Sequence, residues 1–171
     1  MRINHRFVFF ALLGALLALA AVPATARSDA AFMKQAAENG HAEVEASKLA
    51  QQRAKRADVK AFADSMVNDH TKVDGERKQL AASKKVELPT APSNKQKSEL
   101  KSLETADEGK FDQRYTKAFG VKAHEETIKL FQEAAKSASD ADVKAFAQNT
   151  LPSLQRHLEM AKALDSASAG K

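Results

Sequence analysis

Ala57-Asp58-Val59-Lys60-Ala61-Phe62-Ala63 recurs without change at residues 141–147 of this 171-residue chain, 84 positions further on. Aligning the chain on this repeat places Phe32 near Phe111, and each of these residues opens a helical stretch. Self-similarity at a fixed offset is typical of a duplicated supersecondary unit. We therefore expect two related helical hairpins, in which Phe62 and Phe146 occupy equivalent, buried positions.

Apolar residues at spacings of three and four extend outward from both copies of the repeat. This periodicity predicts four long helices, over about residues 29–54, 58–84, 110–137 and 142–166. Asp58 is a plausible N-cap for the second helix. In the third helix Gly120 is a weak point, and in the fourth Pro152 is expected to remove a backbone hydrogen bond and to kink the helix.

A proline-rich break, Leu88-Pro89-Thr90-Ala91-Pro92-Ser93-Asn94, separates the two predicted hairpins. Ser93 or Asn94 can cap a short helix that continues to about residue 106. Tight turns within each hairpin and a long connection between them predict an all-α, ferritin-like four-helix bundle, in which that connection runs the length of the bundle. A simple up-down bundle is the alternative, although it needs no such connection.

The N-terminus has the pattern of an export signal. Basic residues precede an apolar run over residues 7–22, and Ala24-Thr25-Ala26 matches the small-x-small pattern of a cleavage site. The run is shorter than the ~20 residues that span a membrane comfortably, and no later run is as long. We predict a signal peptide over residues 1–26 cleaved after Ala26, a periplasmic bundle domain over 27–166 without a transmembrane segment, and a disordered tail over 167–171.

Composition excludes several classes of function. The chain has no cysteine, so it has no disulfide framework, thiol nucleophile or thiolate metal site. Its net charge of +5 falls to +3 once residues 1–26 are removed, and the remaining charges are interleaved rather than clustered. With no tryptophan and a single tyrosine for base stacking, we expect no nucleic-acid partner. An envelope protein partner stays open.

Several segments together resemble one known family: Val59-Lys60-Ala61-Phe62-Ala63, Asp69-His70-Thr71, Leu88-Pro89, and Leu151-Pro152 followed by His157-Leu158. They are similar to the secreted family catalogued as domain of unknown function 4142, some members of which carry an outer-membrane label. The resemblance covers nearly the whole chain after residue 26. It implies a ferritin-like helical fold and a periplasmic or envelope location, and it implies no established activity.

One polar residue falls on the expected inner face of each predicted long helix: Glu43, His70, His124 and His157. Glu43 and His70 are equally distant from the first hairpin turn, and His124 and His157 are equally distant from the second. At ~1.5 Å per residue the two pairs lie roughly 20 and 25 Å from their turns. They therefore meet in a single layer near the middle of the bundle, whereas His41 lies off the apolar stripe.

Three histidines and one glutamate suit zinc, copper or nickel better than iron. The Glu-x-x-His pattern of di-iron bundles is absent, because Val67, Val121 and Leu154 stand three residues before the histidines. The alternative is a structural polar layer without a metal, which Asp69 or Glu125 could extend.

No catalytic motif is identified, and the first interpretation is a non-enzymatic periplasmic bundle protein with a binding or stress-related role. A metal-binding protein, with or without redox chemistry, is the second interpretation. The third is a module that docks on another envelope component through its helix surface, and it predicts an exposed apolar patch of several hundred Å².

Overall fold

The computed structural model describes residues 24–169, and within this range it contains helices and no strand. The helices are α1 (Ala24–Arg53), α2 (Ala57–Ser83), α3 (Asn94–Glu104), α4 (Glu108–Tyr115), α5 (Ala123–Ser137) and α6 (Ala141–Ala169). A π-helical segment, η1 (Thr116–Lys122), joins α4 to α5. The all-α prediction is therefore confirmed. The predicted signal peptide lies outside the described residues except for residues 24–26, which begin α1.

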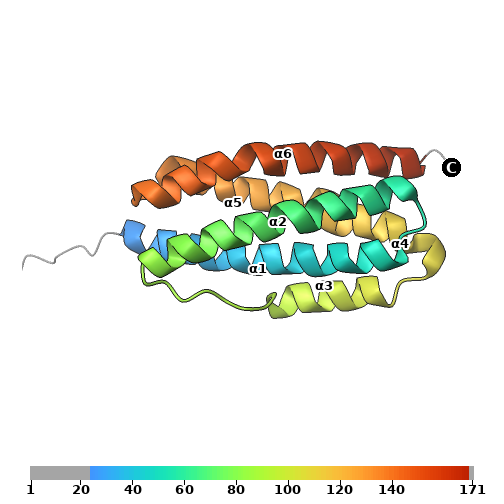
Figure 1. Ribbon diagram of the computed structural model, residues 1–171, viewed down its shortest axis with the longest axis horizontal. Coiled ribbons are helices and arrows are strands. Elements are labelled where there is room, and N and C mark those ends of the chain that lie inside the picture. The colour runs from blue at the N-terminus through green and yellow to red at the C-terminus, as the bar shows by residue number, and fades with distance from the viewer. Residues whose placement is uncertain (1–23, 170–171) are drawn as a thin grey trace, which may run out of the picture.

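The long helices pack side by side in two hairpins (Figure 1). α1 packs against α2, α5 packs against α6, and the hairpins meet through contacts of α1 with α5 and of α2 with α6. The α1–α2 turn and the α5–α6 turn lie at opposite ends of the molecule, whereas an up-down bundle has both at the same end. Between the hairpins, the chain leaves α2 at one end, forms α3 alongside α1 and enters α4 at the other end.

Local contacts define where α2 and α3 begin, and the start of α2 corrects a prediction. At α3, Ser93 and Gln96 form a capping box, in which the Gln96 side chain accepts a hydrogen bond from the Ser93 backbone nitrogen at 2.9 Å. At α2, Arg56 occupies the N-cap position, so the assignment of Asp58 as the N-cap is wrong. The helix begins one residue earlier than predicted, and Asp58 lies in its first turn, where its negative charge favours the helix N-terminus.

The two points expected to weaken helices do not interrupt them. Gly120 lies within η1, where the helix widens instead of ending. A Cβ atom at this position would lie 2.8 Å from the Cβ of Ala161, so glycine lets α6 approach closely. α6 continues through Pro152 as far as Ala169, three residues beyond the predicted end.

Two apolar clusters fill the interior, one toward each end. The cluster near the α1–α2 turn contains Phe62 and Tyr115, and the cluster near the α5–α6 turn contains Phe32, Phe131 and Phe146. Phe62 is 1% exposed and Phe146 is 8% exposed, which confirms their predicted burial. Along α2, along α6 and along the continuous segment of η1 and α5, the buried histidine lies between residues of one cluster and residues of the other.

Candidate metal centre

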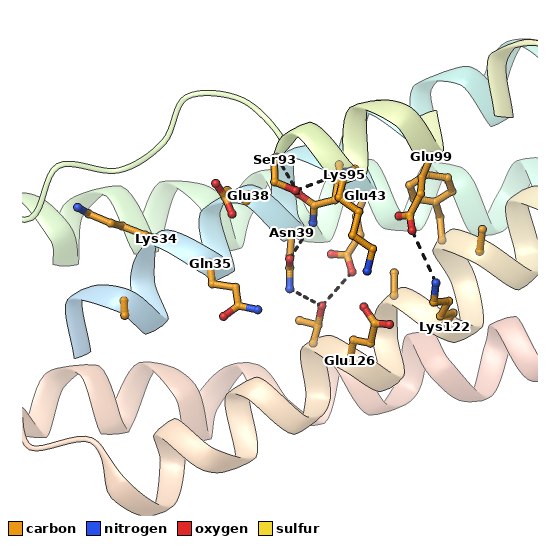
Figure 2. A pocket seen from close by; sticks show the side chains of 17 residues that line it. Lys34, Gln35, Glu38, Asn39, Glu43, Ser93, Lys95, Glu99, Lys122 and Glu126 are labelled. Atoms are coloured by element: carbon orange, nitrogen blue, oxygen red, sulfur yellow. Dashed lines mark hydrogen bonds and ion pairs between the residues drawn. The ribbon is translucent and has the colours of Figure 1, made fainter. Parts of the chain in front are cut away.

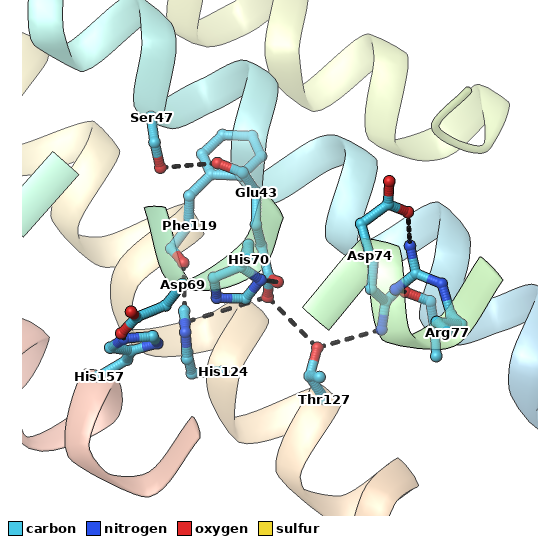
Figure 3. Close-up of polar contacts among 12 residues, drawn as sticks. Glu43, Ser47, Asp69, His70, Asp74, Arg77, Phe119, His124, Thr127 and His157 are labelled. Carbon is cyan, nitrogen blue, oxygen red and sulfur yellow. Dashed lines mark hydrogen bonds and ion pairs between the residues drawn. The ribbon is translucent and has the colours of Figure 1, made fainter. Parts of the chain in front are cut away.

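Four buried side chains, one from each long helix, converge between the two clusters (Figure 3). They are Glu43, His70, His124 and His157. The centroids of the three imidazole rings lie 5.3 to 5.6 Å apart. One ring nitrogen from each histidine lies within 4.8 Å of the other two. The structure thus brings together all four residues that the sequence singles out.

Glu43 orients His70. The Oε2 atom of Glu43 lies 3.0 Å from Nδ1 of His70, while its Oε1 atom lies 4.0 Å from Nδ1 of His124 and accepts a 3.4 Å hydrogen bond from Thr127. Burial raises the pKa of Glu43, but the attraction of the histidines, led by His70, more than offsets this and leaves the pKa below its usual value. Glu43 is therefore an ionised carboxylate at a buried position.

Asp69 orients His157. Its Oδ2 atom lies 2.8 Å from Nε2 of His157 and accepts a 3.0 Å hydrogen bond from Arg156. Burial lowers the pKa of His157 to about 4, although Asp69 opposes the shift, so His157 is a neutral imidazole at pH 7. Of the two acids that could extend the layer, Asp69 joins it. Glu125 lies on the surface instead, 3.7 Å from Lys162.

The π-helical segment orients His124, a contact that the sequence analysis missed. Nδ1 of His124 lies 3.1 Å from the backbone oxygen of Phe119, a residue of η1. Widening a helix to the π form changes which nitrogens its carbonyl oxygens meet. Burial also lowers the pKa of His124, against the opposing attraction of Glu43. Gly120 is the one sequence signal that pointed to this irregular segment.

Each histidine therefore has one nitrogen bound to an oxygen acceptor and a second nitrogen left over. Within the described residues, His70 Nε2, His124 Nε2 and His157 Nδ1 are buried and have no hydrogen-bond partner. In a neutral imidazole the nitrogen that faces an acceptor carries the proton, so the other nitrogen presents a lone pair. Tetrahedral nitrogen ligands about 2.0 to 2.1 Å from a metal lie roughly 3.3 Å apart, so the rings need to close by on the order of 1 Å to share one ion.

A cleft of about 430 Å³ opens on the other side of Glu43 (Figure 2). It is lined by α1, α3, η1 and α5, and Glu43, Phe119 and Thr127 are among its residues. Gln96 donates to Asn39 at 2.8 Å, and Asn39 donates to Thr127 at 3.1 Å, which connects α3 to the hydrogen bond on Glu43.

His41 takes no part in the centre, as its position off the apolar stripe indicates. Its Nε2 atom lies 3.1 Å from the backbone oxygen of Pro89, in the connection between α2 and α3. This contact fastens that connection to α1, and it makes His41 the natural control for the three buried histidines.

The fold and the site define an all-helical protein with a buried cluster of histidines oriented by two carboxylates and a backbone carbonyl. The chain belongs to the family described as Domain of unknown function (DUF4142), whose model matches residues 15–164. No curated protein and no solved structure matches the chain. Among the described helices, none combines the length and the apolar character needed to cross a membrane.

Proposed function

We propose that this protein binds one transition-metal ion through His70, His124 and His157. The observation that carries the proposal is the set of three buried ring nitrogens that have no partner within the described residues and belong to adjacent rings. A buried polar atom without a partner costs about 1 to 3 kcal/mol. One metal ion satisfies all three nitrogens at once.

The donor set narrows the choice of metal. Neutral imidazoles suit zinc, copper and nickel, whereas di-iron bundles depend on several carboxylate ligands. Glu43 and Asp69 each hold the far nitrogen of a histidine, so they act as outer partners that fix the ring and strengthen its lone pair. Three protein ligands leave a fourth position for water or a small ligand.

We further infer that the helices have the ferritin-like arrangement and that the protein works in the cell envelope as a non-enzymatic metal-binding protein with a stress-related role. Hairpin turns at opposite ends and the long connection through α3 support the first inference. The signal-peptide pattern of residues 1–26 supports the second. Among residues 29–168, Met160 is the one exposed large apolar side chain, so the docking alternative gains no support.

The test is metal analysis of untagged protein purified from the periplasm, followed by melting curves with added Zn²⁺, Cu²⁺ or Ni²⁺. Because a ligand that binds the folded state stabilises it, we expect a metal-dependent rise in Tm. His70→Ala should abolish the rise, and His41→Ala should retain it. Glu43→Gln should weaken the affinity by about 10- to 100-fold, as expected for an outer partner.

A different result identifies a structural layer instead. If no metal raises the Tm of the wild-type protein, the proposal is wrong and the histidines serve only to pair buried polar groups. His70→Ala should then still destabilise the fold by roughly 1 to 3 kcal/mol, because Glu43 loses its partner. Urea unfolding without metal measures that cost directly.

A further inference from the structure

Two cavities adjoin each other, and two side chains form the wall between them. The open cleft of about 430 Å³ lies between α1, α3 and α5, and a small cavity of about 20 Å³ is lined by His70 and His157. Glu43 and Thr127 line both cavities. These two side chains therefore separate the open cleft from the space beside the histidines.

The two side chains of this wall are held to each other weakly. A single 3.4 Å hydrogen bond joins the Thr127 hydroxyl to Glu43, which is long for a bond between oxygens. A hydrogen bond at the long limit of the distance range is weak, so these two side chains can part at little cost. The other carboxylate oxygen of Glu43 contacts His70, so one carboxylate borders both the cleft and the histidine.

The charges around the two approaches differ. The cleft is lined by four glutamates and three lysines, Glu38, Glu43, Glu99, Glu126, Lys34, Lys95 and Lys122, and Figure 2 shows Glu126 facing the cleft beside Glu43. Glu99 is paired with Lys122 at 3.6 Å. The other approach, at the half-exposed Asp69, is covered by the guanidinium of Arg156, which repels cations. A cation therefore meets one more carboxylate than ammonium group in the cleft, and the guanidinium of Arg156 at Asp69.

The small cavity beside His70 and His157 is too small for a hydrated metal ion, so the ion needs Glu43 in place of its lost water. A buried cavity needs roughly 10 to 15 Å³ to hold one water molecule, so the inner space holds about one. A hydrated metal ion cannot enter with its water shell. A carboxylate at the boundary can replace the lost water while the ion moves from the cleft to the imidazole nitrogens.

We propose that the cleft is the entrance through which a divalent transition-metal ion reaches His70, His124 and His157, and that Glu43 passes the ion through the wall. This rests on the proposed function, because it presumes that the histidines bind metal. It adds the route and the residue that controls it.

The experiment measures Zn²⁺ uptake and Zn²⁺ release to a chelator in the full-length protein and in variants that obstruct one approach. Ala118→Trp and Ala31→Trp place a ring in the cleft from two exposed positions in its lining. Ala61→Trp is the matched control, because Ala61 is exposed on α2 and lies outside the cleft. Ser153→Trp obstructs the approach beside Asp69.

An obstructed entrance slows binding and release by the same factor, because it leaves both end states unchanged. We expect the cleft variants to lower both rates on the order of tenfold with an unchanged Kd, and Ala61→Trp to behave as the wild type. Wild-type rates in both cleft variants, or slow exchange in Ser153→Trp alone, would overturn the route while leaving the metal site intact. A wild-type protein that binds no Zn²⁺ would overturn both proposals together.

Discussion

The α1–α2 hairpin and the second hairpin, which α5 and α6 form together with the preceding α4 and η1, each include a glycine where a neighbouring helix comes close. A Cβ atom at Gly40 would lie 3.1 Å from Nη1 of Arg77, and a Cβ atom at Gly120 would lie 2.8 Å from the Cβ of Ala161. Arg77 and Ala161 are 84 positions apart, which is the offset of the repeat. The first hairpin uses the space for a buried guanidinium, and the second uses it to bring two helices together. The close contact thus lies at equivalent positions in both hairpins, but the side chain that makes it differs.

A one-residue difference between the hairpins explains η1. Phe32 and Phe111 are 79 positions apart, whereas Gly40 and Gly120 are 80 apart, so the second hairpin has one more residue between its two landmarks. Seven residues of η1 accommodate it, because a π-helix has an additional residue in each hydrogen-bonded turn. The result is a backbone oxygen at Phe119 that orients His124, whereas α1 supplies a carboxylate.

Each hairpin also accepts hydrogen bonds from the backbone of the other hairpin's turn. Asp29 of α1 accepts backbone hydrogen bonds from Ser139 and Asp140 in the α5–α6 turn, at 2.9 to 3.2 Å. Asp112 of α4 accepts backbone hydrogen bonds from Lys55 and Arg56 in the α1–α2 turn, over the same range. The two hairpins are therefore interlocked at both ends of the molecule.

Replacing the two phenylalanines that match in the repeat is the strongest test of whether the two hairpins are equivalent. Phe62→Ala and Phe146→Ala should each destabilise the protein by about 3 to 5 kcal/mol, and Phe62→Ala should cost more because its ring is the more deeply buried. Met160→Ala, at an exposed site, should change stability by less than about 0.5 kcal/mol. Urea unfolding measures all three, and a loss below about 1 kcal/mol at either phenylalanine contradicts the equivalence.

The stability that His157 contributes to the second hairpin depends on pH. The folded state holds the pKa of His157 near 4, below its usual 6.5, so the unfolded chain binds more protons between these values. Stability is therefore full above pH 6.5 and falls as the pH drops toward 4, by roughly 3 kcal/mol from this group. Unfolding free energies across this range should show a shallower slope in His157→Gln, and an unchanged slope would assign the effect to other groups.

The two glycines should respond differently to a methyl group. Gly120→Ala forces a helix to move and should cost about 1 to 3 kcal/mol, because its contact is the close Cβ of Ala161. Gly40→Ala meets the end of a longer side chain, and the helix propensity gained, up to ~1 kcal/mol, should leave it near neutral. Thermal unfolding compares them. Rescue of Gly120→Ala by Ala161→Gly confirms the contact, and equal losses at both glycines contradict the distinction.

The smallest expected effect concerns the interlocked turns. Asp29→Ala and Asp112→Ala should each cost about 1 to 2 kcal/mol, because each leaves two backbone nitrogens without acceptors. Asp29 is buried, so its loss should be the larger of the two. Hydrogen exchange should report faster opening at the α5–α6 turn in the first variant and at the α1–α2 turn in the second. Exchange that quickens only at the mutated helix itself would argue against the interlock.

The sequence by itself determined the helices, the family and the four residues of the centre. Helical periodicity located each long helix to within a few residues, because burial of one face imposes a period that the chain must repeat. Equal distances from the hairpin turns located the layer of Glu43, His70, His124 and His157, because helix rise per residue is constant. Both inferences use only regular geometry along one chain.

The tertiary structure alone decided how those side chains are oriented. The partners of His157 and His124 are Asp69 on another helix and a carbonyl oxygen released by η1. No periodicity reports them, because each depends on the rotation of one helix against its neighbour and on a local departure from the α-helical hydrogen-bond pattern. Glu43, predicted as a ligand, lies 3.0 Å from Nδ1 of His70, a contact that depends on how α1 and α2 pack. Contacts between helices determine which nitrogen of each histidine faces an oxygen and which has no partner among the described residues.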